Sequence, residues 1–560
     1  MTRPPERHAE TTYASRKTTS MHSSSADRRF AVAALLSVSA LALAACGGGA
    51  AADDSGASGT PAAGGSATFA VSSDAGCVDP QQVGSNDGIW STRQVVDSLT
   101  DQDPETGEIV PWLAESWEIN GDATAFTFHL HEGATFSDGS PVDAAAVKAN
   151  LDRIPDLGAR GGLPKGYLAG YAGTTVVDPL TATVTFAQPN AQFLQATSTH
   201  SLGLLSPATV SLSDDERCKA VVGSGPFVLD SYTPDQSLVL TKRDGYGWGS
   251  SLWQHDGEAY LDEITFQFVP ESGVRAGSLQ SGEVDAISSI GPQDEAAFTG
   301  SDIVLQDRSN PGVVFNLGFN NANPIIADPA VREAISLSID RQQIVDTVYT
   351  SQTKPATSIL AATTPYYESQ EDLLANDPQQ AATLLEDAGW QKGPDGVYAK
   401  DGQKLTLTIS WNAIISTNKP ALELIQQQTA KAGIDLQLKE MQTSESAAVL
   451  ASGDYEIYWY NVTRADPDIL RSQYATQGAN RHKLPASELD DVLKKQGATG
   501  DPTDRADYVA QAQQLIVENY YAVPIVELTT VLAHGPNIHQ ITYDASSRIQ
   551  LFDTWVDAAG

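Results

Sequence analysis

The segment from Tyr458 to Asp468 holds a dense group of side chains that could recognise a small molecule. Three aromatic residues, Tyr458, Trp459 and Tyr460, are followed by Arg464 and Asp466, which carry charges of opposite sign. An aromatic ring can stack on an apolar or cationic group, and a guanidinium can bind a carboxylate through parallel hydrogen bonds. The same pattern fits a buried strand that runs into a surface loop, so both interpretations stay open from these residues alone.

A second candidate is the pair Trp411 and Asn412, which follows the strand pattern of Leu405–Ser410. Open α/β sheets bind ligands beyond the carboxyl ends of their strands, where Trp411 would offer an apolar wall and Asn412 a donor and an acceptor. The alternative is that Trp411 is an ordinary core residue.

Sequence motifs of the common catalytic sites are missing from this chain. It contains no Gly-x-Ser-x-Gly, no His-Glu-x-x-His and no Gly-x-x-x-x-Gly-Lys. His129 and His131 share one face of the alternating segment 126–131, but no third metal ligand stands nearby, which favours a solvated strand face. We therefore expect no catalytic residue, no metal and no cofactor.

The first Cys residue ends an export signal. Arg28 and Arg29 precede the apolar run Phe30–Ala45, and Cys46 follows it. The ending Leu43–Cys46 resembles a bacterial lipobox, so we expect residues 1–45 to be removed and Cys46 to carry lipid; a plain secretory signal is the alternative. Met21 would give a conventional short basic region, and we expect it to be the true start.

The other two Cys residues, Cys77 and Cys218, are predicted to form a disulfide. Export places both outside the cytosol, where a pair of thiols tends to oxidise. Two free thiols are the alternative.

Composition narrows the class of partner. The 560 residues include 34 Lys+Arg and 70 Asp+Glu, a net charge of −36. Such an acidic chain argues against nucleic acid and against anionic membrane surfaces as partners. Residues 46–66 are rich in Gly, Ala and Ser and are predicted to be a flexible tether.

Strand and helix patterns alternate through the rest of the chain. Asp328-Pro329 and Asp377-Pro378 each combine an N-cap with a Pro at the first helical position, and Gly389 predicts the end of the second helix. Further elements are predicted as a strand from Thr68 to Val71, a helix at 421–433, a helix at 504–521 and a strand at 523–528. This mixture indicates an α/β architecture with more than one lobe.

An ordered set of short motifs resembles a known family of proteins. The motifs are Pro111–Trp117, Gly133–Gly139, Gly223–Phe227, Lys242–Trp248, Tyr260–Phe266, Leu279–Ala286, Leu317–Asn320, Val331–Ile335 and Ile339–Ile344. In this order and spacing they closely resemble the peptide/nickel-type (family 5) extracellular solute-binding proteins of bacterial ABC importers.

The resemblance implies a periplasmic-binding-protein type II fold, a two-lobed α/β clamp with an extra subdomain inserted in lobe I. Lobe I would comprise residues 67–98, 222–309 and 525–560, the inserted subdomain 99–221, and lobe II 310–524. The hinge would lie near 313–320 and 523–528. Cys77 and Cys218 then fall near the two ends of the insertion, which suits a disulfide.

The resemblance also implies the function. We expect a monomeric, lipid-anchored receptor on the outer face of the cytoplasmic membrane, which captures short peptides or peptide-like solutes and delivers them to a membrane permease. A metal chelate, opine or sugar is the alternative ligand, and a secreted lipoprotein hydrolase is an alternative of another class.

The family's ligand-binding loop matches the Tyr458 segment, which adds Asn461 and Thr463 to the candidates. Thr463 stands where peptide binders of the family often place an aspartate for the ligand amine, so Asp466 is the candidate substitute. Arg464 is the candidate for a ligand carboxylate. From lobe I, we expect Asn86 and Asp87 to face the cleft.

Overall fold

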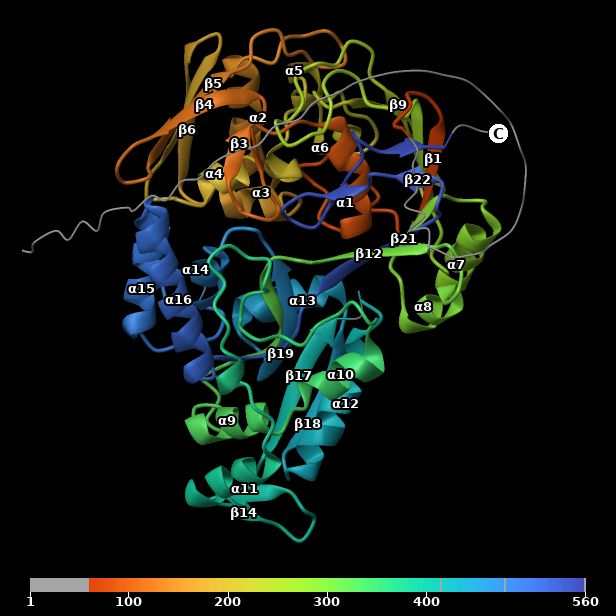
Figure 1. Ribbon diagram of the computed structural model, residues 1–560. Coiled ribbons are helices and arrows are strands. Elements are labelled where there is room, and N and C mark those ends of the chain that lie inside the picture. Colours follow the sequence, from red (N-terminus) through yellow and green to blue (C-terminus); the bar gives the residue numbers. More distant parts are fainter. Residues whose placement is uncertain (1–59, 413–414, 478–479, 558–560) are drawn as a thin grey trace, which may run out of the picture. The chain divides into compact units, whose positions relative to one another are not determined.

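The computed structural model describes residues 60–412, 415–477 and 480–557. The predicted signal, the lipidation site Cys46 and most of the tether lie outside these residues. Within them, three separate sheets, each with its own apolar core, hold most of the strand residues (Figure 1).

The first sheet has seven strands and includes the predicted strand near the start of the folded chain. β1 pairs in parallel with β10 and β11, while the outer pairs are antiparallel. In sheet order the strands are β12 (Val304–Ser309), β21 (Thr529–His534), β11 (Ala286–Ser288), β1 (Ser66–Val71), β10 (Glu263–Phe268), β9 (Ser237–Lys242) and β8 (Phe227–Thr233). Phe69 of β1 stacks on Phe266 of β10 in the core. The helices α1 (Asn86–Thr92), α7 (Ser272–Ser281) and α8 (Pro292–Phe298) belong to this part of the chain.

The second sheet has four antiparallel strands and lies within the predicted insertion. Its strands in order are β4 (Ala114–Ile119), β5 (Ala125–Leu130), β7 (Thr181–Phe186) and β6 (Tyr171–Asp178). Phe126, Phe128 and Leu130 are buried on one face of β5, as the alternation predicts. The helices here are α2 (Ala144–Arg153), α3 (Gly162–Tyr167), α4 (Phe193–Ala196), α5 (Pro207–Val210) and α6 (Asp214–Arg217).

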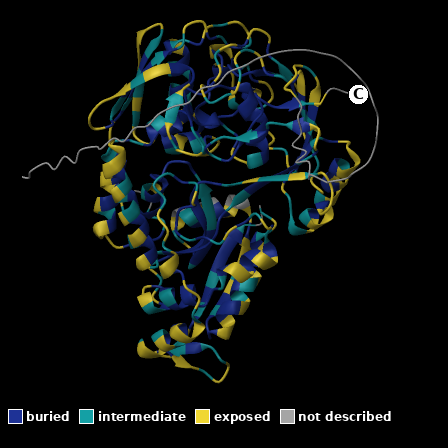
Figure 2. Ribbon diagram, in the orientation of Figure 1, coloured by how far each residue is buried: buried dark blue, intermediate teal, exposed yellow. Residues whose placement is uncertain are grey.

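The third sheet has five strands, and most residues of its interior strands are buried (Figure 2). In order they are β18 (Asp435–Met441), β17 (Thr406–Asn412), β19 (Ile457–Thr463), β13 (Gly312–Phe319) and β20 (Ala522–Val526). The helices around it are α9 (Pro329–Leu337), α10 (Arg341–Val348), α11 (Pro378–Asp387), α12 (Asn418–Lys431), α13 (Thr443–Ser452), α14 (Ile469–Tyr474), α15 (Glu488–Ala498) and α16 (Pro502–Glu518).

Capping residues determine where several of these helices begin or end. The Asp328 carboxylate accepts a hydrogen bond from the Ala330 amide, and the Asp377 carboxylate accepts from two amides at the start of α11. Gly389 follows α11 with a φ of 90°, a conformation that favours Gly. Both predicted Asp-Pro helix starts are confirmed.

Two short segments connect the seven-stranded and five-stranded sheets. Asn310 and Pro311 join β12 to β13, and Glu527 and Leu528 join β20 to β21. The Asn310 amide donates to the Leu528 carbonyl at 2.7 Å, so the two crossings touch. The structure places the first crossing before the predicted 313–320, because residues 313–319 belong to β13, an interior strand of the sheet with neighbours on both sides. The domain boundaries themselves stay a prediction.

Cys77 and Cys218 form a disulfide in the structure. It ties the loop after β1 to the end of α6, and the Val78 amide donates to the Cys218 carbonyl at 3.1 Å beside it. No helix among the described residues is long and apolar enough to cross a membrane.

Candidate functional site

A cavity of about 1290 Å³ is lined by residues from three parts of the fold, which are the parts built on the seven-stranded sheet, on the four-stranded sheet of the insertion and on the five-stranded sheet. The first part contributes α1, the start of α7 and the C-terminal segment, and the insertion contributes Leu163, Tyr167 and 199–201. The five-stranded part contributes the end of α10, the start of α12 and the end of β19. A solute in this cavity would therefore contact groups on both of the larger sheets.

Four of the predicted site residues line this cavity: Asn86, Asp87, Asn461 and Thr463. Asp87 is buried, and one oxygen of its carboxylate accepts from the Ser72 hydroxyl at 2.5 Å and the Ser73 amide at 3.0 Å. Asn461 and Thr463 reach the cavity because they end β19, at the carboxyl edge of the sheet.

Trp411 and Asn412 do not line the cavity. The predicted strand end at Ser410 is wrong, since β17 continues through both residues, in register with Glu440 and Met441 of β18. Trp411 is 3% exposed and packs in the core of the five-stranded part. The loop that does reach the cavity contributes Ile415 to Thr417, beyond the true strand end.

The three aromatic residues of β19 pack in the interior and are not among the cavity residues. Trp459 stacks on Phe315 with ring centres 5.1 Å apart, and its indole N–H donates to Asn418 Oδ1 at 2.9 Å. Tyr458 and Tyr460 pack in the smaller clusters beside that core, where the Tyr460 hydroxyl lies 3.0 Å from His482 Nε2. The structure thus gives these rings the core role that the sequence left open.

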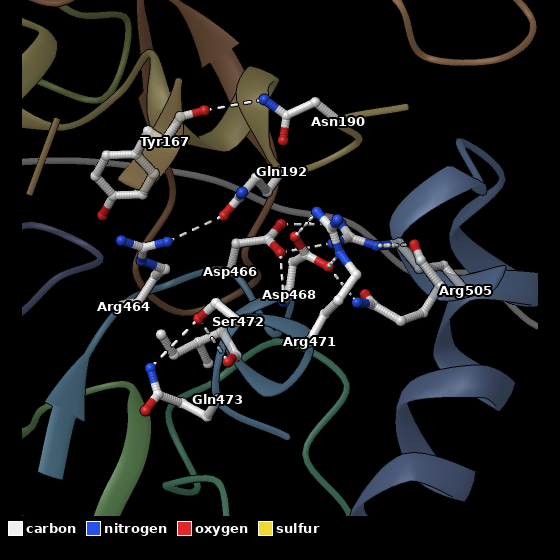
Figure 3. A network of polar contacts seen from close by, with 12 residues as sticks. Tyr167, Asn190, Gln192, Arg464, Asp466, Asp468, Arg471, Ser472, Gln473 and Arg505 are labelled. Atoms are coloured by element: carbon white, nitrogen blue, oxygen red, sulfur yellow. Dashed lines mark hydrogen bonds and ion pairs between the residues drawn. The ribbon is translucent and has the colours of Figure 1, made fainter. Parts of the chain in front are cut away.

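Arg464 reaches from the end of β19 to the insertion, as Figure 3 shows. Its guanidinium carbon lies 4.2 Å from the centre of the Tyr167 ring, and its Nη1 donates to Gln192 Oε1 at 3.3 Å. Arg464 is not a cavity residue, but Tyr167 is. Burial raises the pKa of the Tyr167 hydroxyl, and the positive charge of Arg464 opposes that rise.

Asp466 is held by an arginine and is not open to a ligand amine. Its two carboxylate oxygens accept from Arg505 at 2.5 and 2.9 Å, and one of them also accepts from the Asp468 amide. Burial acts to lower the pKa of Arg505, but Asp466 outweighs it and the pKa is raised. Asp468 in turn pairs with Arg471 and accepts from Gln496 (Figure 3). We call these four residues, Asp466, Asp468, Arg471 and Arg505, the closed cluster.

Sequence reasoning missed five cavity residues that carry buried polar atoms without a hydrogen-bond partner in the described part of the chain. These atoms are Trp90 Nε1, Tyr349 Oη, Glu527 Oε2, Thr529 Oγ1, and Nε and Nη1 of Arg548. Arg548 and Glu527 are 6% and 3% exposed, so both are charged groups taken out of water. We call Glu527 and Arg548 the open pair.

Glu527 lies in the crossing between β20 and β21, where two hydrogen bonds hold it in position. Its amide donates to the Lys354 carbonyl at 3.1 Å, and its Oε1 accepts from the Ala362 amide at 2.9 Å. One sequence signal was available, because an acid directly follows the wholly apolar run Ala522–Val526.

A hairpin near the C-terminus presents Arg548. β23 (Thr542–Tyr543) pairs with β24 (Ile549–Gln550), and Asp544 Oδ1 accepts from the Arg548 amide within the turn. Gln94 Nε2 donates a hydrogen bond to the Ile549 carbonyl, and Gln94 Oε1 accepts one from the Leu551 amide. These two bonds hold β24 in position. Burial lowers the pKa of Arg548, while Asp544 opposes that effect.

Arg275 lines the same cavity, but each of its guanidinium nitrogens has an acceptor. Its guanidinium donates to the carbonyls of Val269, Pro270, Ser288 and Ser289 at 2.7 to 3.2 Å. His200 is a further cavity residue, and burial, with Arg548 as a second cause, lowers its pKa to about 3. His200 is therefore neutral at physiological pH.

A second hollow, of about 420 Å³, is lined only by residues of the five-stranded part. None of its described lining atoms is a buried polar group without a partner. Across the described ranges, no group of three His, Cys, Asp or Glu could hold a metal ion. The larger cavity is therefore the better candidate for solute binding.

Comparison with known proteins identifies the family. The family model for bacterial extracellular solute-binding proteins, family 5, matches residues 108–481. The glutathione-binding protein GsiB of Shigella dysenteriae is 29% identical over 446 residues, which cover 76% of this chain and 82% of that protein.

Solved structures agree in fold. NikA from Brucella suis, in complex with Fe(III)-EDTA, aligns with a TM-score of 0.76 and 25% identity over 88% of this chain and all of its own. AppA from Bacillus subtilis, in complex with a nonapeptide, aligns with a TM-score of 0.71 and 18% identity over 89% of this chain and all of its own. The two-lobed periplasmic-binding-protein type II fold is confirmed, and the chain belongs to the bacterial extracellular solute-binding proteins, family 5.

Proposed function

We propose that this protein is the receptor of an ABC importer and captures short peptides or peptide-like solutes in the cavity of about 1290 Å³. The observation that carries the proposal is that this cavity takes its walls from both larger sheets and from the insertion. The names of similar proteins support the ligand class, since they include a glutathione-binding protein and a complex with a nonapeptide.

Binding would act by shifting a conformational equilibrium. A solute that contacts both lobes only when they are closed supplies the free energy of closure through those extra contacts. The crossings at Asn310 and Glu527 are the segments about which such a motion would occur. The closed form would then deliver the solute to the permease, and no bond would be broken by this protein.

We also propose that export and lipidation at Cys46 hold the protein, as a monomer, at the outer face of the cytoplasmic membrane. The basic and apolar segment before Cys46 supports this. Mass spectrometry of the mature N-terminus would test it, and an unmodified Cys46 would contradict it.

A thermal-shift screen tests the ligand class. The panel holds glutathione, di- to pentapeptides, amino acids, sugars, and metal chelates such as Fe(III)-EDTA. A ligand that binds only the folded state stabilises it by about 2.7 kcal/mol at a concentration of 100 times Kd. We expect peptides to raise the melting temperature; a shift with a sugar or chelate and with no peptide would contradict the peptide assignment.

A further inference from the structure

The open pair is the starting point. Glu527 and Arg548 are both buried, both line the cavity, and neither forms an ion pair with another described residue. An uncompensated buried charge is costly, and proteins normally pair it or neutralise it. Resting on the function proposed above, we propose that the solute is a zwitterion whose carboxylate binds Arg548 and whose protonated amine binds Glu527.

Arg548 has the properties of a carboxylate receptor. Its guanidinium makes no hydrogen bond or ion pair with any described residue, and Nε and Nη1 are buried without an acceptor. Arg275 shows that this is not general in the cavity, because each of its three guanidinium nitrogens donates to a backbone carbonyl. A guanidinium stays charged under all ordinary conditions, so Arg548 needs an anionic partner, and a ligand carboxylate has the right shape.

Glu527 has the properties of an amine receptor. Oε1 is occupied by the Ala362 amide, which fixes the carboxylate, and Oε2 remains without a donor. Thr529 stands two residues further along, and its hydroxyl also lines the cavity without a partner. An ammonium has three donors in different directions, so it can bind a carboxylate oxygen and a hydroxyl together.

The charges that line the cavity restrict the ligand further. The lining acids are Asp87, Glu271, Asp294 and Glu527, and the lining bases are Arg275 and Arg548. The first three acids surround Arg275 electrostatically, which leaves Glu527 for the solute. An excess of lining acid disfavours a chelate with several carboxylates and favours a peptide with no net charge or a positive one. Trp90 Nε1 adds one neutral donor, suited to a peptide carbonyl.

The experiment combines changes in the ligand with changes in the protein. Mixed-sequence tripeptides are offered as free peptides, as C-terminal amides and as N-acetyl peptides, and Kd is measured by calorimetry with the full mature protein. The unmodified protein should prefer the free peptide by about 30-fold or more over each blocked form. This arm needs no substitution, so it does not depend on whether a variant folds.

Two variants then assign the groups. In Arg548→Gln the preference for acid over amide should disappear while the preference for amine over N-acetyl remains, and Glu527→Gln should show the reverse. Arg548→Lys should recover part of the acid preference. Glu118→Gln, the matched loss of an exposed acid outside the cavity, should change neither preference.

The outcomes separate the two proposals. Equal binding of free and blocked tripeptides by the unmodified protein would overturn the zwitterion assignment and leave peptide binding intact. A variant pattern in which both preferences survive Arg548→Gln and Glu527→Gln would do the same. If no tripeptide binds while a sugar or chelate stabilises the protein, the peptide function itself fails.

Discussion

The closed cluster and the open pair are two groups of buried charge that the fold treats in opposite ways. In the closed cluster, Asp466 gives both its oxygens to Arg505, and Asp468 pairs with Arg471. In the open pair, the Arg548 side chain forms no hydrogen bond or ion pair with a described residue, and Glu527 Oε2 has no donor among them. Only the open pair lines the cavity. Buried charges that pair with one another stabilise the fold, whereas a buried charge without an ion pair at a cavity wall is available to bind a ligand of opposite charge.

The same contrast exists inside the cavity between Arg275 and Arg548. Both are buried cations on the cavity wall, yet the Arg275 guanidinium donates to four carbonyls and that of Arg548 to none within the described ranges. Presence at a cavity wall is therefore not enough to indicate ligand contact. The count of unmet hydrogen bonds is the sharper criterion, because an unmet buried donor has a cost that a ligand can remove.

The largest expected effect comes from breaking the closed cluster. Asp466→Asn leaves the Arg505 guanidinium buried without its counter-charge, and we expect a loss of about 3–5 kcal/mol in the free energy of unfolding. Urea unfolding measures it. The control is Asp395→Asn, which breaks the exposed pair with Lys404 and should change stability little. Equal effects of the two variants would remove the structural role of the cluster.

The open pair should respond in the opposite direction in the ligand-free protein. Arg548→Met removes a buried charge that has no ion-pair partner in the part of the chain that the structure describes, so we expect the free energy of unfolding to rise by roughly 1 kcal/mol. A loss as large as that of Asp466→Asn would reveal that Arg548 is needed for folding and would break the comparison.

Asp97 shows a third solution for a buried charge, which is to keep the proton. Tyr246 and Trp248 donate to its carboxylate at 3.0 and 2.9 Å, and burial nevertheless raises its pKa from 3.8 to about 7. Between about pH 4 and pH 7 the folded protein holds a proton that the unfolded chain has lost, so this group's contribution to stability falls as the pH rises. Relative to Asp97→Asn, the unmodified protein should therefore lose a few kcal/mol over that range.

Urea unfolding of both proteins at several pH values checks this difference. His200 and His482, whose pKa values burial lowers to about 3 and about 4, act in the opposite direction by losing stability as the pH falls. Because both proteins contain them, they cancel in the comparison. A difference that is constant with pH would show that Asp97 is ionised in the folded state.

The sequence predicted what depends on local chemistry. The Asp-Pro starts of α9 and α11 were found because an N-cap and the helix that it starts are adjacent in the chain. The end of β17 was misplaced, since Trp411 and Asn412 are held by pairing with β18, which no local pattern reveals. Arg548 was missed for the same reason, because its importance comes from a cavity that distant segments build together.

The last prediction tests Arg464, which the sequence suggested as the carboxylate receptor. Its guanidinium lies on the Tyr167 ring and bonds Gln192, both in the insertion, so it positions a cavity wall instead of lining the cavity. Arg464→Gln should lose an interaction of about 1–2 kcal/mol, and affinity should fall by roughly tenfold or less, equally for free, amidated and N-acetyl tripeptides. Calorimetry with the three forms measures this. A selective loss for the free carboxylate form would transfer the anchor from Arg548 to Arg464, because only a residue that binds the carboxylate can distinguish it from its amide.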